Sequence, residues 1–154
     1  MKKLIKRREI PGGNPVSDNA LLDRLYRSRH IKNSQELDRT LQSMLNPNQL
    51  HGIQHAVSLL VDAYQQQQKI VIVGDFDADG ATSTALSVLA LRMLGFTDVE
   101  YLVPNRFEQG YGLSVPVAEM AMEKGVQLLM TVDNGVSSFE GVAYLKDQGV
   151  KVLI

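Results

Sequence analysis

Apolar residues repeat at helical spacing in the first part of the chain and change to short continuous runs after residue 68. Three segments of the first part place apolar residues three or four positions apart, which predicts amphipathic helices over 21–29, 33–45 and 46–68. Two of them carry helix start signals, since Asn33 is followed by Glu36 and Asn46 by a proline. The pattern therefore predicts a helical lead-in over residues 17–68.

In the second part, short apolar runs alternate with helical segments. Strands are expected over 69–74, 99–103, 126–132 and 150–154. Helices are expected between them, each ending at a glycine, over 81–95, 114–125 and 137–149. This alternation predicts right-handed βαβ units, and wholly apolar strands are typical of a parallel sheet covered on both faces. The expected fold class is α/β, with N-terminal helices followed by a parallel sheet over residues 69–154.

Charge is divided unevenly along the 154 residues, although the net charge is only −1. Residues 1–40 carry ten Lys or Arg against five Asp or Glu, so +5, and the rest carry six against twelve, so −6. A basic arm over 1–16 beside an acidic body suggests a polyanion partner and a cation site; a solvated helical face with a disordered tail is the alternative.

Composition excludes several classes of protein. The chain has no cysteine, which excludes disulfides and thiolate metal sites. It has neither an apolar run of membrane-spanning length nor the apolar core of a signal peptide. A cytoplasmic protein without membrane contact is therefore expected.

The stretch DFDADG, residues 75–80, places three carboxylates at alternate positions directly after an expected strand. An EF-hand loop would need a preceding helix and a glutamate at its twelfth position, where this chain has Leu86. A phosphatase of the haloacid dehalogenase type is a minor alternative, with Asp77 and Asp79 in its motif but the threonine one residue late, at Thr82. Helix capping by an aspartate accounts for one carboxylate and not for three.

Carboxylates this close raise one another's pKa unless a cation lies among them. Asp75, Asp77 and Asp79 follow a strand at the edge where open parallel sheets bind ligands. Asp133 follows the strand 126–132 in the same way, although an Asp-Asn-Gly turn without further function is the alternative there. Because oxygen ligands suit Mg²⁺ or Mn²⁺, we expect the two strand ends to share one metal site.

The loop VPNRFEQGYGLS, residues 103–114, follows the middle strand of the expected sheet. Arg106 is a candidate for holding a phosphate, and Tyr111, next to Gly112, for stacking on a base or sugar. The alternative is a capping loop with a surface arginine and a packed tyrosine.

His51 and His55 have the spacing of some zinc sites. Gly52 stands where a metalloprotease has glutamate, so a surface or packing role is expected for both histidines.

Taken in order, the stretches VGDFDADGATSTA, YLVPNRFEQGYGLS and TVDNGVSS resemble the RecJ family of bacterial single-strand-specific 5′→3′ DNA exonucleases, within the DHH phosphoesterase superfamily. The stretch LYRSRHIKNSQEL resembles that family's lead-in, so the resemblance covers nearly the whole chain. It implies that four aspartates bind catalytic Mn²⁺ or Mg²⁺ in a two-metal site: Asp75, Asp77, Asp79 and Asp133. It also implies that Arg106, Tyr111 and Gly112 contact single-stranded DNA.

The same resemblance implies hydrolysis of a phosphodiester at a 5′ end with release of mononucleotides, in DNA recombination and repair. Single-strand-binding protein and a helicase are the protein partners it implies. The family's third motif, Asp-His-His, should follow a strand like the one expected over 150–154, where this chain ends. We therefore expect an N-terminal fragment that is inactive alone, because part of the metal site is missing. The alternatives are a non-catalytic nucleic-acid-binding remnant and a small-molecule phosphoesterase of the same superfamily.

Overall fold

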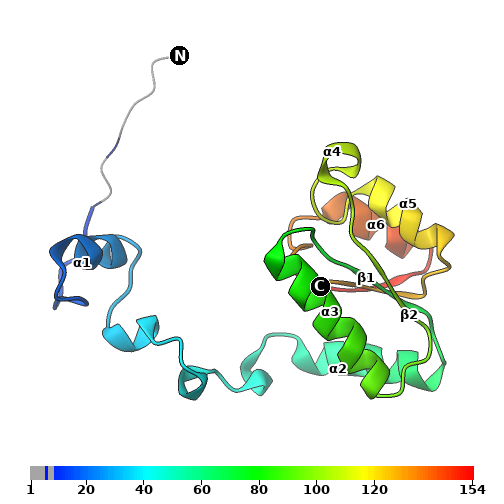
Figure 1. Cartoon of the computed structure of the whole chain (residues 1–154), viewed down its shortest axis with the longest axis horizontal. Coiled ribbons are helices and arrows are strands. Elements are labelled where there is room, and N and C mark those ends of the chain that lie inside the picture. Colours follow the sequence, from blue (N-terminus) through cyan, green and yellow to red (C-terminus); the bar gives the residue numbers. More distant parts are fainter. Residues whose placement is uncertain (1–5, 7–8) are drawn as a thin grey trace, which may run out of the picture. The chain divides into compact units, whose positions relative to one another are not determined.

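The computed structural model describes residue 6 and residues 9–154, which belong to two compact units over 1–50 and 51–154 (Figure 1). The basic arm expected over residues 1–16 falls partly outside the described residues, with four of its cations: Lys2, Lys3, Arg7 and Arg8. Helix α1 lies in the first unit and the whole sheet lies in the second.

The first unit contains helix α1 (Ala20–Arg27) and three 3₁₀ turns, at Ser34–Leu37, Leu41–Ser43 and Pro47–Gln49. Asn19 begins α1, because its side chain accepts hydrogen bonds from the backbone amides of Leu21 and Leu22 at 3.0 and 3.2 Å. Asp23, inside the helix, accepts from the amide of Val16 at 2.7 Å and so fixes the preceding segment. The helix expected over 21–29 is confirmed, with slightly earlier bounds.

The helix expected over 33–45 is wrong. The amide of Glu36 does lie 3.2 Å from the side-chain oxygen of Asn33, as a cap requires, but the pair starts a 3₁₀ turn. Asp38 is extended, and its carbonyl accepts from the Ser43 hydroxyl at 2.9 Å in place of a helical amide. The apolar side chains of this stretch stay largely exposed. A short helix without a surface to pack on is marginal, so the periodicity alone did not suffice.

The helix expected over 46–68 begins later, as α2 (Ile53–Gln65). The Asn-Pro pair that should start it forms only a 3₁₀ turn, and Gly52 then has φ +79°, a left-handed conformation that interrupts helical geometry. Ala63 of α2 is fully buried in the core on one side of the sheet. The second compact unit therefore begins ahead of the boundary at 68/69 expected from the sequence.

The sheet has four parallel strands in the order β2-β1-β3-β4. They are β1 (Ile70–Val73), β2 (Val99–Leu102), β3 (Leu128–Thr131) and β4 (Lys151–Leu153). Val73 at the end of β1 is in register with Leu102 and Thr131, so three strands end level with one another. The α/β fold with a parallel sheet, expected from the apolar runs, is confirmed.

Helices cover both faces of the sheet (Figure 1). On one face they are α2 and α3 (Ala78–Met93), and on the other α5 (Val115–Glu123) and α6 (Phe139–Asp147). The one-turn helix α4 (Arg106–Gln109) lies in the loop after β2 and has no buried residue. Ile70 and Ile72 pack with α2 and α3, whereas Val71 and Val73 pack with α5 and α6. All four are fully buried, because alternate side chains of a strand enter opposite faces.

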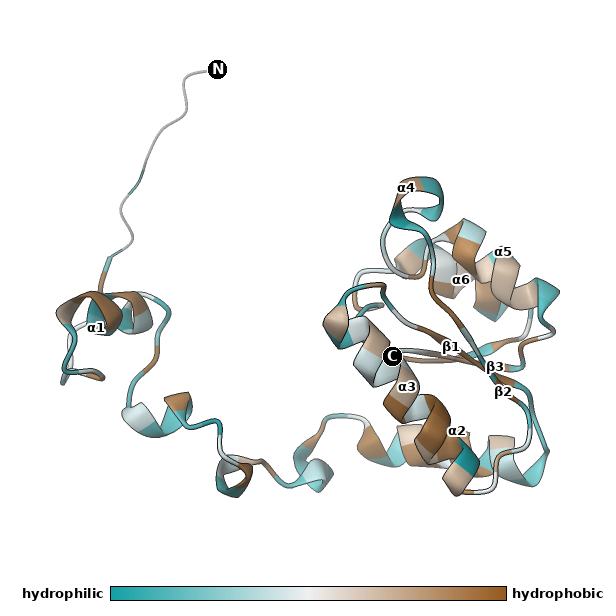
Figure 2. Cartoon of the chain, in the orientation of Figure 1, coloured by the Kyte–Doolittle hydropathy of each residue, from teal (hydrophilic) through white to brown (hydrophobic). Residues whose placement is uncertain are grey.

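Apolar residues also continue onto the outer side of α3 (Figure 2). Leu89 and Met93 are 60% and 87% exposed there. Within the described part of the chain, no helix has both the length and the hydrophobicity to span a bilayer.

The strand order creates a switch point beside β1. The chain leaves β1 toward β2 on one side and later returns to pair β3 on the other side. Loops after β1 and β3 therefore diverge, and the crevice between them is where open α/β sheets bind ligands. Asp75 follows β1 and Asp133 follows β3, so both acidic motifs flank this crevice.

An ion-pair cluster holds the edge strand β2 and gives a pH-dependent contribution to stability. Glu100 lies 2.6 Å from the Nζ atom of Lys69 and 2.8 Å from that of Lys124. Hydrogen bonds first from Lys124 and then from Lys69 lower the pKa of Glu100 from 4.5 to about 2. A carboxylate whose pKa falls on folding stabilises the protein above its unfolded pKa, and this stabilisation disappears as the pH drops toward the folded value.

We expect Glu100→Gln to lower Tm at pH 7 by roughly 1–3 °C, since exposed ion pairs contribute little each. Thermal unfolding of both proteins, followed by circular dichroism from pH 7 to 3, should show this gap narrowing below pH 4.5. Glu119→Gln, on an exposed position of α5, is the matched control and should leave Tm unchanged. A gap that stays constant down to pH 3 would contradict the prediction.

Candidate metal centre

The turn after β1 positions the first two carboxylates of the DFDADG motif. Asp77 caps α3, because its side chain accepts from the amide of Gly80 at 3.1 Å. The helix therefore begins at Ala78 and not at the expected residue 81, since the aspartate and not the later hydroxyl residues supplies the cap. Gly80 packs so closely on the backbone of Asp75 that a Cβ atom there would overlap it. The motif glycine thus fixes Asp75 at the strand end.

Asp75 is paired with an arginine from the loop after β2. The Nε and Nη2 atoms of Arg106 lie 3.0 and 2.5 Å from the two carboxylate oxygens of Asp75. The same Nη2 atom lies 3.2 Å from Asp77. Asp75 is 3% exposed, and hydrogen bonds from Arg106 hold its pKa below the ordinary value against the opposing effect of burial. One guanidinium thus neutralises the buried carboxylate and bridges to a second one.

Two aromatic rings flank this guanidinium. Its carbon lies 4.4 Å from the ring centre of Phe76 and 4.9 Å from that of Tyr111, both within cation–π range. The sequence analysis singled out Tyr111 but not Phe76. The position of Phe76 between two aspartates of the motif is the feature that could have pointed to it. Phe107, which follows the arginine, is 96% exposed and was also missed.

The turn after β3 carries the fourth carboxylate. Asp133 has φ +61°, a left-handed conformation that Asp and Asn tolerate better than other residues do. The side chain of Asn134 donates to the carbonyls of Val73 and Val132, at 3.1 and 2.9 Å, and so ties the end of β1 to the end of β3. The sequence assigned no role to Asn134, although its place after the aspartate in a turn is the signal that points to it.

The loop after β2 closes over this turn. The Tyr111 hydroxyl donates to the carbonyl of Asp133 at 3.4 Å. Gly112, with φ +70°, lies close to both Asn134 and Ser138, where a Cβ atom would come within 3.3 Å of the Ser138 hydroxyl. The loop also contains the one-turn helix α4, which the sequence did not predict.

Negative charge is in surplus at the crevice. Asp133 is exposed as a residue, yet partial desolvation of its carboxyl group and the charges of Asp77 and Asp79 raise its pKa. A side-chain hydrogen bond with Asp77 contributes in the same direction. Against these carboxylates and Asp75, the described residues offer Arg106 as the contacting cation. This excess of negative charge favours the binding of a cation at the site.

The donor atoms fit a hard divalent cation, but their arrangement is not that of a finished metal site. All the acidic donors are carboxylate oxygens, which suit Mn²⁺ and Mg²⁺. Among the described residues, however, no three acidic or histidine side chains are grouped closely enough to hold a metal ion. Asp75 faces Arg106 and Asp77 caps α3, so two of the four carboxylates are engaged elsewhere.

The structure brings together most of the residues singled out from the sequence. Asp75, Asp77, Arg106 and Tyr111 are joined by direct contacts, and Asp133 and Gly112 adjoin them. Asp79 lies exposed in the first turn of α3, where its charge acts on Asp133.

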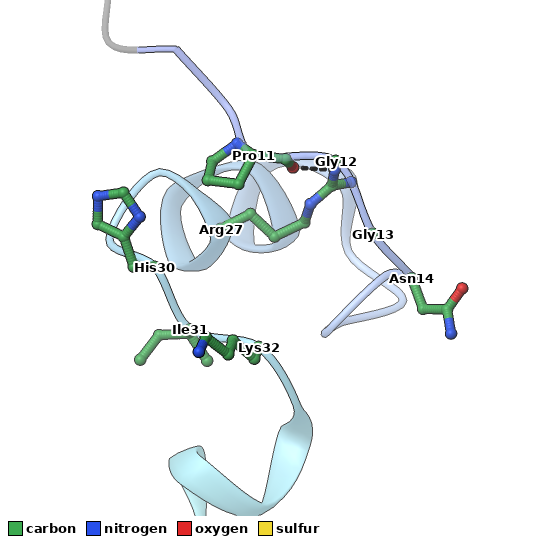
Figure 3. Close-up of a pocket in the computed structure, with 8 residues that line it drawn as sticks. All are labelled: Pro11, Gly12, Gly13, Asn14, Arg27, His30, Ile31 and Lys32. Carbon is green, nitrogen blue, oxygen red and sulfur yellow. Dashed lines mark hydrogen bonds between the residues drawn. The ribbon is translucent and has the colours of Figure 1, made fainter.

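A separate cavity of about 320 Å³ lies in the first unit (Figure 3). Its cations do not converge, because Arg27 already donates to the carbonyl of Pro11 and pairs with Asp23 at 3.5 Å. His30 and Lys32 lie apart from that guanidinium (Figure 3). This cavity lacks the convergent charges of a phosphate site.

Comparison with known proteins identifies the family. Residues 69–154 match the model of the DHH family, N-terminal domain. The single-stranded-DNA-specific exonuclease RecJ of Haemophilus influenzae is 82% identical over all 154 residues, which cover 27% of that relative. The chain therefore belongs to the DHH family, and it spans about a quarter of the length of the curated relatives it matches.

Two solved structures support the fold assignment. A crystal structure of exonuclease RecJ bound to manganese matches with a TM-score of 0.63 and 37% identity, over 71% of this chain and 28% of that one. RecJ of Thermus thermophilus in complex with Mn²⁺ matches with a TM-score of 0.58 and 32% identity, over 82% of this chain and 17% of that one. Both neighbours are manganese-bound RecJ proteins.

The close approach at Gly80 gives a test of how the acidic turn is built. We expect Gly80→Ala to lower the free energy of unfolding by about 1–3 kcal/mol, although alanine is the better helix former, because its Cβ atom would overlap the Asp75 backbone. Urea unfolding measures the change. Gly12→Ala, at a position open to solvent, is the control. A stabilised Gly80→Ala protein would show that the turn is not closely packed.

Proposed function

We propose that this chain supplies the acidic part of the metal site in an exonuclease that hydrolyses single-stranded DNA from its 5′ end and releases 5′-mononucleotides. The observation that carries the proposal is that the aspartates after β1 and β3 and the Arg106 loop all lie at the switch point of the sheet. The names of the relatives, single-stranded-DNA-specific exonuclease RecJ, support the choice of substrate.

Four aspartates form the acidic centre that would hold Mn²⁺ or Mg²⁺: Asp75, Asp77, Asp79 and Asp133. When bound, such a cation lowers the pKa of an attacking water and stabilises charge on the phosphoryl oxygens. The chain's own residues set the position of this chemistry. The Asn134 bridge holds the two strand ends together, and the Asp77 cap fixes the turn after β1. The Asp-His-His motif of the family does not occur in these 154 residues, so further ligands would come from outside them.

The loop after β2 is suited to hold the nucleic acid. Arg106 presents a flat, permanently charged group beside the carboxylates, which suits a phosphate oxygen. Tyr111 and Phe139, 60% and 78% exposed, line a cavity of about 290 Å³ that also includes Ser138. Aromatic walls of this kind stack on bases irrespective of sequence, and Gly112 lets the loop lie flat against the turn below.

The family resemblance extends the proposal to a cytoplasmic role in DNA recombination and repair. Single-strand-binding protein and a helicase are the protein partners proposed on the same basis. The +5 charge of residues 1–40 is compatible with contact to a polyanion, since basic surfaces attract phosphate backbones.

The test is hydrolysis by the complete gene product that contains this chain. With Mn²⁺ present, single-stranded DNA labelled at its 5′ end should lose the label as mononucleotide, while a duplex should persist. Asp133→Asn should reduce the rate at least about 100-fold, because it removes a carboxylate from the acidic centre. Asp147→Asn, an exposed position at the end of α6, is the matched control and should retain full activity.

Two other outcomes would overturn the proposal. Cleavage of a short phosphodiester without action on long single-stranded DNA would indicate a small-molecule phosphoesterase. Salt-dependent binding of single-stranded DNA that survives Asp77→Ala, with no hydrolysis by the unmodified protein, would indicate a non-catalytic binding protein. The positive charge of the first 40 residues is the feature that favours the second outcome.

A further inference from the structure

Arg106 holds its two carboxylate partners unequally. Both oxygens of Asp75 receive a hydrogen bond, at 3.0 and 2.5 Å, whereas Asp77 receives one at 3.2 Å. The Asp75 side chain is 4% exposed and the Asp77 side chain 51%. Solvent weakens the attraction between charges, so the contact with Asp77 is the weaker of the two. If one contact has to break, it is the one to Asp77.

The guanidinium is held in place even without Asp77. The ring centres of Phe76 and Tyr111 lie 4.4 and 4.9 Å from its carbon atom, and the buried carboxylate of Asp75 accepts two hydrogen bonds from it. Removing Arg106 from Asp75 would leave a buried charge without a partner, which is strongly unfavourable. The contact between Arg106 and Asp75 is therefore expected to persist, whereas the contact between Arg106 and Asp77 can break.

Arg106 leaves the negative charge of Asp77, Asp79 and Asp133 largely uncompensated. Asp77 shares one contact with Arg106, and Asp79 and Asp133 lie beside it without a contact to that guanidinium among the described hydrogen bonds. We propose that Arg106 is an internal counter-cation that exchanges Asp77 for a divalent metal: of its contacts with Asp75 and Asp77, it keeps only the one with Asp75 when a metal binds. This inference rests on the metal site of the proposed function.

The exchange gives Asp75 a role different from that of the other three aspartates. Within the four-aspartate centre of the proposed function, Asp75 would then be a positioning residue that acts through Arg106, and Asp77, Asp79 and Asp133 would be the carboxylates that face the cation. Release of Asp77 would free one N–H of the Arg106 Nη2 atom, whose other N–H stays on Asp75, and this N–H could then donate to an anionic oxygen. Metal and phosphate binding should then promote each other, because each favours the arrangement in which Arg106 has left Asp77.

Metal affinity tests the exchange without reference to activity. In the complete gene product that contains this chain, we expect Arg106→Gln to bind Mn²⁺ about 3–10-fold more tightly than the unmodified protein, since the competing charge is gone. Arg106→Lys, which keeps the charge, should stay near the unmodified affinity, and Asp77→Asn should bind at least about 10-fold more weakly. The loss of the free-Mn²⁺ electron paramagnetic resonance signal measures all three. Arg29→Gln, an exposed arginine of the first unit, is the matched control.

Nuclear magnetic resonance of the unmodified protein gives a second measurement that needs no variant. With ¹⁵N-labelled arginine and diamagnetic Mg²⁺, the Nε–H signal of Arg106 should stay slow to exchange with water, because its bond to Asp75 persists. The Nη2 signals should shift as Asp77 is released. Loss of the protected Nε–H signal on metal binding would overturn the inference, because Asp75 would then have been the group released.

The outcomes separate this inference from the proposed function. Equal Mn²⁺ affinity in the unmodified protein and in Arg106→Gln, with no change in the arginine signals, would overturn the exchange and leave the metal site intact. No Mn²⁺ binding at millimolar metal by the complete gene product, with or without Arg106→Gln, would overturn the metal site itself, and the exchange with it. If Arg106→Gln does not fold, as circular dichroism would show, the magnesium titration of the unmodified protein decides.

Discussion

Negative charge gathered at one point of the sheet is the constraint around which the second unit is organised. Parallel strands end at a common edge, and the strand order places the loops after β1 and β3 on either side of one crevice. Both loops carry aspartates, so the fold concentrates like charges that would otherwise stay apart. The buried Asp75 is tolerable because Arg106 reaches it from a third loop. The negative charge that the topology buries at Asp75 is therefore neutralised locally, by Arg106.

Close backbone contacts hold the turns around Asp75 and Asp133 in place. Gly80 allows the turn after β1 to fold back on Asp75, and the Asn134 side chain joins the ends of two strands through their carbonyls. The core beneath is mainly apolar on both faces of the sheet, with Thr84 and Thr131 as buried polar residues. Asp75 lies at a strand end and Asp77 caps a helix, whereas Arg106 comes from a one-turn helix in a loop and is held by its bonds to Asp75. The loop after β2 is thus joined to the acidic turn through this guanidinium.

The aromatic residues link this electrostatic arrangement to a neighbouring cavity. Phe76 and Tyr111 confine the guanidinium, and Tyr111 at the same time borders the cavity beside α6. A single side chain therefore contacts both the charged centre and the neighbouring cavity. Two solved manganese-bound RecJ structures share this fold.

The sequence by itself determined the α/β class, the parallel sheet and the edge on which the site lies, because apolar runs and glycine-terminated helices are local signals and Asp75 and Asp133 each follow a strand. It failed over 33–45, where helical periodicity had no surface to pack against and Asp38 and Ser43 bonded to the backbone instead. Only the tertiary structure showed that Arg106 pairs with Asp75, since residues 31 positions apart meet through the strand order and no local pattern encodes that distance. The partner of a buried charge is decided by the packing of the whole sheet.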